Sequence, residues 1–160
     1  MWVPMPTMRK KEKEVCDHEV MEAMLRSSDV LRLGLCDDGE PYIVPVCFGY
    51  EEGGVIFVHS AREGRKLDII RRHNRVCFEV DHMDKLVNKG LACKWTMDYH
   101  SIIGTGKASL VTEPDQIKRA LDVIMRHYGG KPPFEYSEAS LSRMLIIRID
   151  IIGMTCKRSM

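Results

Sequence analysis

Residues 41–81 constrain the fold more than any other part of the chain. Two apolar strand patterns, joined by a turn at Gly53-Gly54, run directly into a short basic helix, and a third strand pattern follows. Strands joined by hairpin-length turns are antiparallel, because parallel strands need a crossover of a dozen or more residues. The segment therefore predicts a mainly antiparallel sheet with a helix inserted between two of its strands.

The remaining patterns extend this sheet and add two helices. We expect six strands, three helices and a polar loop; the strands cover 30–36, 42–50, 55–59, 76–81, 95–111 and 145–152, the helices 17–27, 63–73 and 112–128, and the loop 82–92. The strand at 95–111 is expected to break near Asp98. Six amphipathic strands can close into a small barrel, which removes exposed edges. The predicted fold class is mainly β, a six-stranded antiparallel split β-barrel with flanking helices. A ferredoxin-like sandwich is the alternative, but the succession of three strands near the start argues against it.

The helix at 112–128 has the clearest signals. Thr112 is expected to cap it, and Pro114 suits its first turn because proline lacks the N–H that would be unpaired there. Gly129-Gly130 ends it. Its predicted buried stripe consists of Ile117, Ala120, Leu121, Ile124, Met125 and Tyr128.

Pro45 lies inside the strand pattern at 42–50. Because proline cannot donate to a strand ladder, it is found at sheet edges or bulges. Backbone groups near Pro45 therefore have no strand partner on one side. They either remain solvated at a plain edge strand or bind something other than a neighbouring strand.

The basic helix has an unusual first turn. Ser60 followed by Glu63 matches a capping box, which predicts that the helix begins at Ser60. Arg65 and Lys66 then lie near the helix N-terminus, where the helix dipole already places partial positive charge. A bound phosphate would balance these cations, since free backbone N–H groups point at it. The alternative is a solvated charge pair on a surface turn.

Composition excludes several classes of protein. The chain has 160 residues, and we expect a loose tail over 1–10 and one domain over 11–160. Its formal net charge is +1, so no bulk electrostatic attraction to nucleic acid is expected. No run of about 18 apolar residues is present, so no membrane span is expected. The six cysteines have no metal-ligand spacing, which predicts a reduced cytoplasmic protein without a metal site.

Several blocks of sequence resemble a known group. The chain is similar to the FMN-binding split-barrel superfamily related to pyridoxamine 5'-phosphate oxidase, and within it to the nitroimidazole-resistance (Nim) type. The blocks that carry the resemblance are PYIVPVCFGYE (41–51), FVHSAREGRKLD (57–68), RVCFEVD (75–81), WTMDYHSIIGTGKA (95–108), TEPDQIKRALDVIMRHY (112–128) and RIDIIGMTCK (148–157).

The resemblance implies a homodimer with flavin mononucleotide (FMN) at the subunit interface. Basic residues of the helix after the third strand would meet the FMN phosphate, here Arg65 and Lys66, with Ser60 as a hydroxyl donor. The flavin ring would lie against the main chain of the second strand, at Val44, Pro45, Val46 and Cys47. The partner subunit would contribute Trp95, Tyr99 and Ser101.

The resemblance also makes His59 a candidate catalytic residue. In Nim-type proteins the matching histidine is suspected in cofactor or substrate chemistry, and an imidazole can hand a proton to a nitro group as it is reduced. The other possibility is that His59 only caps the turn or contacts the phosphate. His100 departs from the group, since many relatives carry arginine there, so a contact with an anion at this position would depend on pH.

These observations predict an FMN-dependent oxidoreductase that reduces a small electron-poor substrate, such as a nitroaromatic or 5-nitroimidazole. The flavin would supply the redox chemistry. A reduced nicotinamide would be the external donor, although the sequence has no dinucleotide-binding fingerprint. The alternative is a non-catalytic protein of the same fold that holds flavin (FMN, FAD or a deazaflavin) or haem, with His59 or His100 as iron ligand. A purely structural or regulatory dimer is the third possibility.

Overall fold

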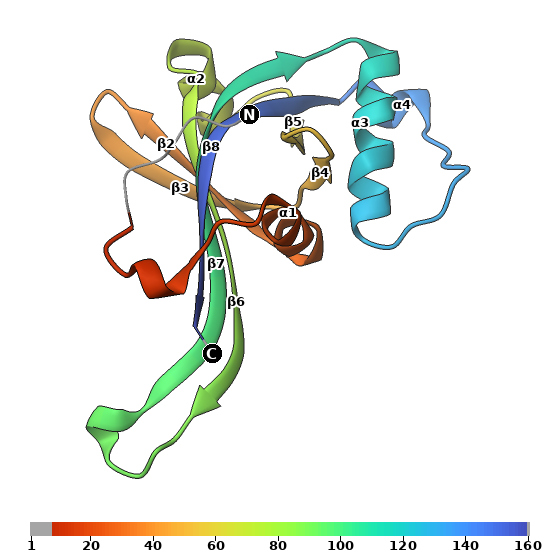
Figure 1. Ribbon diagram of the computed structural model, residues 1–160. Coiled ribbons are helices and arrows are strands. Elements are labelled where there is room, and N and C mark those ends of the chain that lie inside the picture. The colour runs from red at the N-terminus through yellow and green to blue at the C-terminus, as the bar shows by residue number, and fades with distance from the viewer. Residues whose placement is uncertain (1–7, 160) are drawn as a thin grey trace.

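The structure is a computed structural model that describes residues 8–159, and it consists of one strongly curved antiparallel sheet flanked by helices (Figure 1). The strands are β1 (Glu14–Val15), β2 (Leu31–Asp37), β3 (Glu40–Val46), β4 (Gly49–Glu51), β5 (Val55–Ala61), β6 (Arg75–Val87), β7 (Thr96–Val111) and β8 (Met144–Ser159). The helices are α1 (His18–Ser27), α2 (Arg65–Arg72), α3 (Pro114–His127) and α4 (Glu138–Leu141), with single 3-10 turns η1 (Lys11–Lys13) and η2 (Ala92–Lys94).

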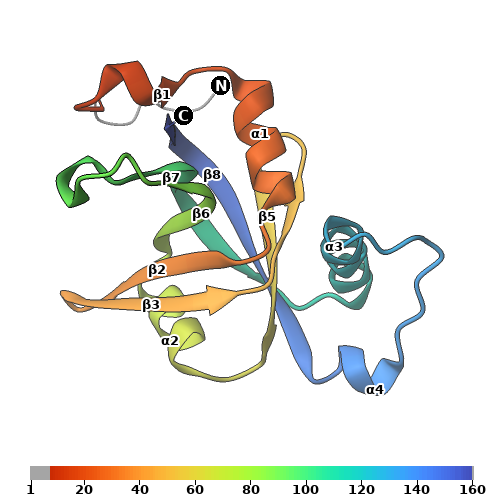
Figure 2. The same ribbon diagram turned by 90° about the horizontal axis from the view of Figure 1, so that it is seen from below.

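The order of the strands shows why the sheet is curved. It is β3-β2-β6-β7-β8-β5-β4, and β1 pairs with β8 outside this path. β3 and β4 are therefore at opposite ends of the path, yet only Cys47 and Phe48 separate them in the chain. Two residues span at most about 7 Å, so the sheet must roll until its two ends meet. Figure 2 shows the result, in which the chain leaves the end of β3 and turns to run beside β5.

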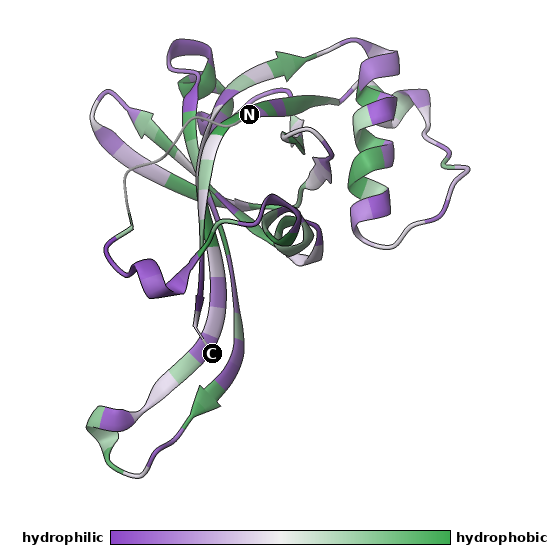
Figure 3. Ribbon diagram, viewed as in Figure 1, coloured by the Kyte–Doolittle hydropathy of each residue, from purple (hydrophilic) through white to green (hydrophobic). Residues whose placement is uncertain are grey.

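The barrel has a core on each face of its wall. The inner core joins α1 and α2 to side chains from most strands, including Leu33, Phe78 and Ile147. The outer core lies between α3, α4 and the outer face of β5 and β8, and its members include Phe57, Ile124 and Ile146. Figure 3 shows the corresponding amphipathic pattern, with the hydrophobic stripe of α3 turned toward the sheet. No helix among residues 8–159 is long and apolar enough to span a bilayer.

The predicted fold class is confirmed, but the structure has eight strands where six were expected. The strand predicted over 42–50 is two strands, since the chain leaves the ladder at Cys47 and Phe48. The predicted polar loop over 82–92 is wrong for residues 82–87, because β6 continues to Val87 and pairs with β7, whereas residues 88–91 do lie outside helices and strands. The predicted break near Asp98 is also wrong, since β7 runs past it without interruption. Residues 82–87 form a strand because they pair with a neighbouring strand, and composition alone does not predict such pairing.

The helix at 112–128 is confirmed with smaller differences. α3 begins at Pro114 with Glu113 as N-cap, so Thr112 is not the cap, and Gly129 adopts a positive φ of 82° just beyond its end. Ile117, Ala120, Leu121 and Ile124 are buried as predicted, whereas Met125 and Tyr128 are 42% and 43% exposed. The predicted domain boundary at residue 10 is untested, and residues 1–7 of the predicted tail lie outside the described part.

Gly104 on β7 leaves room for a core aromatic ring. It is the register partner of Phe78, and a Cβ at Gly104 would overlap the Phe78 ring. We expect Gly104→Ala to lower the free energy of unfolding by about 1–3 kcal/mol, as overpacked core substitutions do. Gly34→Ala is the matched control, because a Cβ there would lie 3.5 Å from its nearest neighbours, an ordinary contact. Urea unfolding of the two variants checks this, and equal stability would contradict it.

Candidate functional site

The seam where the two ends of the sheet meet carries the first group of predicted site residues. β3 pairs with β2 alone among the strands of residues 8–159, so the other edge of β3 has no strand beside it. Val44 and Val46 are half-buried, while Pro45 and Cys47 are exposed. The prediction that Pro45 lies on an edge strand is confirmed, and the main chain over 44–47 is available to a ligand.

The start of α2 carries the second group. The capping-box prediction is wrong: Ser60 lies within β5, and the N-cap of α2 is Gly64, with a positive φ of 132° and no side-chain cap. Arg65 and Lys66 are nonetheless the first two residues of the helix, as predicted. Because no side chain caps this end, its first N–H groups remain available to an anion.

Arg65 turns back onto the β2–β3 hairpin. Its Nε lies 3.6 Å from Oδ2 of Asp37, and its guanidinium lies 4.6 Å from the ring centroid of Tyr42 on β3. Asp37 also bonds to Arg72 of the same helix. These contacts hold the start of α2 against the β2–β3 hairpin, whose strand β3 carries the first group of predicted residues. Sequence reasoning missed Asp37 and Tyr42, for which the only available signal was their place on the hairpin.

Ser60 and His59 occupy opposite faces of β5. Ser60 is 3% exposed and follows the inward positions Ile56 and Val58, whereas His59 is exposed and follows the outward position Phe57. The hydroxyl of Ser60 is buried and has no hydrogen-bond partner among the described residues. Such a group costs free energy unless a ligand or water satisfies it.

The remaining predicted residues lie on a projecting arm, the hairpin of residues 82–100 formed by the ends of β6 and β7 (Figure 1). Trp95 is 47% exposed and donates from Nε1 to the Gly90 carbonyl at 3.4 Å. Tyr99 has the ammonium groups of Lys13 and Lys157 at 5.8 and 5.7 Å from its ring centroid, and Ser101 is half-buried just beyond the arm. Figure 1 shows the arm pointing away from α2, so within one chain Trp95 and Tyr99 do not join Arg65.

His100 stands in a small polar cluster at the base of the arm. Its Nδ1 lies 3.4 Å from Oδ2 of Asp84, and Oδ1 of Asp84 lies 3.9 Å from Nε2 of His82. The imidazole rings of His82 and His100 are 5.3 Å apart between centroids. The cluster fixes the orientation of His100, which the sequence did not predict.

The residues at the seam fit a phosphate-bearing ligand. An uncapped helix end, two adjacent cations and an unpartnered buried hydroxyl occur within the seven residues from Ser60 to Lys66. A phosphate accepts several hydrogen bonds and carries charge of the opposite sign. The neighbouring edge of β3 supplies main-chain groups for a larger ligand attached to that phosphate.

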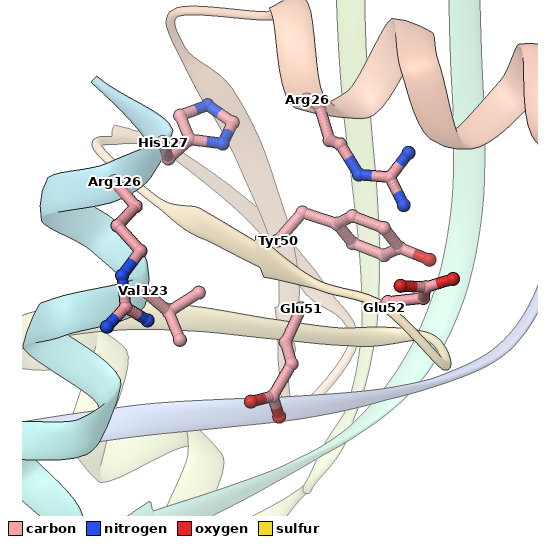
Figure 4. Close-up of a pocket in the computed structure, with 7 residues that line it drawn as sticks. All are labelled: Arg26, Tyr50, Glu51, Glu52, Val123, Arg126 and His127. Carbon is pink, nitrogen blue, oxygen red and sulfur yellow. The ribbon is translucent and has the colours of Figure 1, made fainter. Parts of the chain in front are cut away.

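A separate cavity of about 340 Å³ lies between α1, β4 and α3 (Figure 4). Its walls are Arg26, Tyr50, Glu51, Glu52, Val123, Arg126 and His127. None of these is a predicted site residue. The charges on its walls are largely paired locally, since Arg26 bonds to Glu22 at 2.7 Å and Glu51 bonds to Arg119 at 3.0 Å. The residues predicted from the sequence therefore lie outside this cavity.

Comparison with known proteins identifies the family of the chain and structures with a related fold. The family model described as pyridoxamine 5'-phosphate oxidase matches residues 17–158. The chain belongs to this family. A search of curated proteins gives no match. Among solved structures, a candidate 5-nitroimidazole antibiotic resistance protein from Bacteroides thetaiotaomicron is 32% identical, with a TM-score of 0.81 over 91% of this chain and 86% of that one.

Two more distant structures share the split-barrel fold. A flavocytochrome from Azotobacter vinelandii is 19% identical, with a TM-score of 0.80 over 96% of this chain and 72% of that one. A FAD and haem binding protein from Mycobacterium smegmatis is 18% identical, with a TM-score of 0.81 over 92% and 73%. At these identities the likeness shows the fold alone. The match to the family confirms the resemblance drawn from the sequence blocks.

The unpartnered hydroxyl of Ser60 allows a test without any ligand. We expect Ser60→Ala to leave the free energy of unfolding of the free protein unchanged or to raise it by up to about 1 kcal/mol, because no hydrogen bond is lost. Ser28→Ala is the control: the Ser28 hydroxyl is also buried but donates to the Met24 carbonyl at 2.8 Å, so its loss should cost about 1 kcal/mol. Denaturant unfolding measures both. A larger loss for Ser60→Ala than for Ser28→Ala would contradict the assignment.

Proposed function

We propose that this protein binds FMN at the barrel seam and reduces a small electron-poor substrate, with a nitroaromatic such as a 5-nitroimidazole as the substrate class. The observation that carries the proposal is the buried, unpartnered hydroxyl of Ser60 five residues before the cations of α2. Family membership and the 32% identity to a candidate 5-nitroimidazole resistance protein support it. The names of the two distant relatives, a flavocytochrome and a FAD and haem binding protein, are consistent with a flavin.

Each predicted residue has a role in this proposal. Arg65 and Lys66 neutralise the phosphate, and the hydroxyl of Ser60 donates to one of its oxygens after a change of side-chain rotamer. The main chain of Val44, Pro45, Val46 and Cys47 orients the polar edge of the ring. When bound, the flavin supplies the redox chemistry, and a reduced nicotinamide is the proposed external donor.

His59 is proposed to hold the proton that the substrate takes up. Its side chain is exposed on the opposite face of β5 from Ser60, so it does not compete for the phosphate. An imidazole can give or take a proton near neutral pH. For His59 to fill this role, the substrate must reach both the exposed end of β5 and the flavin ring.

The phosphate assignment is tested by Arg65→Ala/Lys66→Ala. Each lost charge-assisted hydrogen bond costs about 1.5–3 kcal/mol, so the FMN dissociation constant should rise by about 100-fold or more. Arg71→Ala/Arg75→Ala removes the same charge from the last turn of α2 and the first residue of β6, and should change the affinity by less than about threefold. Titration of flavin fluorescence into the apoprotein measures both. Unchanged affinity in the first double variant defeats the phosphate assignment.

A homodimer is part of the proposal, because the arm exposes apolar side chains to solvent. Met83, Leu86, Leu91, Trp95 and Met97 are between 43% and 64% exposed, and Figure 3 shows hydrophobic colour at the end of β6 and near the tip. A two-stranded ribbon is at best marginally stable by itself in water. A second copy that covers the arm would bring Trp95, Tyr99 and Ser101 to the partner's flavin.

Leu86→Gln/Met97→Gln tests this interface. The two residues are cross-strand partners on the arm, and exposed hydrophobic patches of this kind mark interaction surfaces. We expect the dimer of the unaltered protein to dissociate into monomers in sedimentation velocity experiments, with FMN affinity falling in parallel. Met125→Gln, a substitution of an equally exposed residue on α3, should remain dimeric. A wild-type protein that sediments as a monomer would rule out the dimer.

A non-catalytic flavin or haem carrier is the second candidate. It is favoured by the contact between His100 and Asp84, because a carboxylate that orients an imidazole is common behind metal-ligating histidines. The absorption spectrum of freshly purified protein separates the two. Flavin bands together with nicotinamide-dependent reduction of a 5-nitroimidazole support the enzyme, and a Soret band supports the carrier.

A cytoplasmic location is also proposed. Cys16, Cys36, Cys47, Cys77, Cys93 and Cys156 all lie in the described part of the chain, and none is in a disulfide. Reduced thiols are the rule in the cytosol.

Burial raises the pKa of the Cys156 thiol to about 11, so this thiol stays protonated within the core.

A further inference from the structure

The last turn of α3 holds the two-residue link between β3 and β4. The hydroxyl of Tyr128, at the C-cap of α3, accepts a hydrogen bond from the Phe48 N–H at 3.1 Å and donates one to the Asp29 carbonyl at 2.7 Å. One phenol thus ties together the end of α3, the link at the seam and the segment before β2. Phe48 is in the middle of this arrangement and is fully buried.

Three further contacts hold the same part of the structure. The ring of His127 lies 4.4 Å from the Phe48 ring centroid, and its Nε2 donates to the Ser28 carbonyl at 2.8 Å. A Cβ at Gly49 would come within 2.7 Å of the main-chain N and Cα of Ile124, so the backbone of α3 lies directly against the first residue of β4. Figure 4 shows His127 at the end of α3, across the cavity from Tyr50 of β4.

The exposure of Tyr128 shows that its ring is not a core side chain. Its side chain is 43% exposed, while its hydroxyl is engaged on both sides. Burial of the hydroxyl raises the pKa of Tyr128 and the Phe48 N–H opposes that shift. The raised pKa keeps the phenol protonated, so it remains a donor to Asp29 while it accepts from Phe48.

The link shares Cys47 with the segment 44–47 that is proposed to face the flavin ring, and Phe48 is the next residue. We infer that Tyr128 is a positioning residue of the flavin site, which acts by fixing the Phe48 N–H and with it the exposed edge of β3. This inference rests on the proposed function. It goes beyond it by assigning a role to α3, none of whose residues was predicted to touch the cofactor.

Tyr128→Phe tests the inference, because it removes the hydroxyl and keeps the ring. We expect the Phe48 amide to exchange with deuterium at least about fivefold faster, since its acceptor is lost. We expect the FMN dissociation constant to rise by about three- to tenfold, the effect of one neutral hydrogen bond. Gly49→Ala, which pushes the link away from α3 without touching the hydroxyl, is the second variant and should give both changes.

Tyr136→Phe is the matched control. Its hydroxyl donates to Asp122 of α3 at 3.0 Å and has no contact with the link, so neither the Phe48 exchange rate nor the FMN affinity should change. Melting midpoints of all variants separate these local effects from general loss of stability.

The outcomes separate this inference from the function on which it rests. Unchanged Phe48 exchange in Tyr128→Phe overturns the hydrogen-bonded link, and faster exchange with unchanged FMN affinity overturns the positioning role while the proposed function stands. If the unaltered protein binds no FMN, the proposed function fails and the positioning role fails with it, whatever the exchange rates show.

Discussion

The two-residue link between β3 and β4 is the constraint on which the rest of the structure depends. Because these strands are at opposite ends of the sheet order, the link forces the sheet to roll up. The ends meet without pairing, which leaves one side of β3 without a neighbouring strand in the described chain. A barrel closed by hydrogen bonds all round would have no such edge. The seam is therefore both the product of the topology and the place where main-chain groups are open to a ligand.

The helices divide the two faces of β5 between them. The inner core, to which α1 and α2 contribute, lies on the side of β5 that carries Ile56 and Val58, and α3 packs on the other side, against Phe57. This alternation follows from the two-residue period of a strand. Adjacent residues of the sequence FVHSA thus lie on opposite sides of the sheet. A ligand bound through Ser60 therefore meets the other side of β5 from the exposed His59.

The sequence was sufficient for the elements whose local signals agree with their packing. Asp17 caps α1 with its side chain, Asp38 and Gly39 form the β2–β3 turn with positive φ, and Pro45 lies on an edge. It was insufficient where long-range pairing decides. Residues 82–87 form a strand because β7 pairs with them, and the Ser60–Glu63 capping box fails because Ser60 pairs with Leu145 in the β5–β8 ladder. Tyr128 was assigned to the buried stripe, since periodicity shows which face a residue occupies but not that its hydroxyl bridges two distant segments.

Asp37 changes the electrostatic argument for the phosphate. From the sequence, Arg65 and Lys66 looked like cations without an anion, but Asp37 already lies 3.6 Å from Arg65 and also bonds to Arg72. Arg65 has more than half of its side chain exposed, and an ion pair between exposed groups contributes only about 0–1 kcal/mol. A phosphate held by charge-assisted hydrogen bonds gains about 1.5–3 kcal/mol per bond. In the proposed complex the phosphate therefore binds Arg65 either together with Asp37 or in its place. Arg72 still holds Asp37, so the β2–β3 hairpin stays attached to α2.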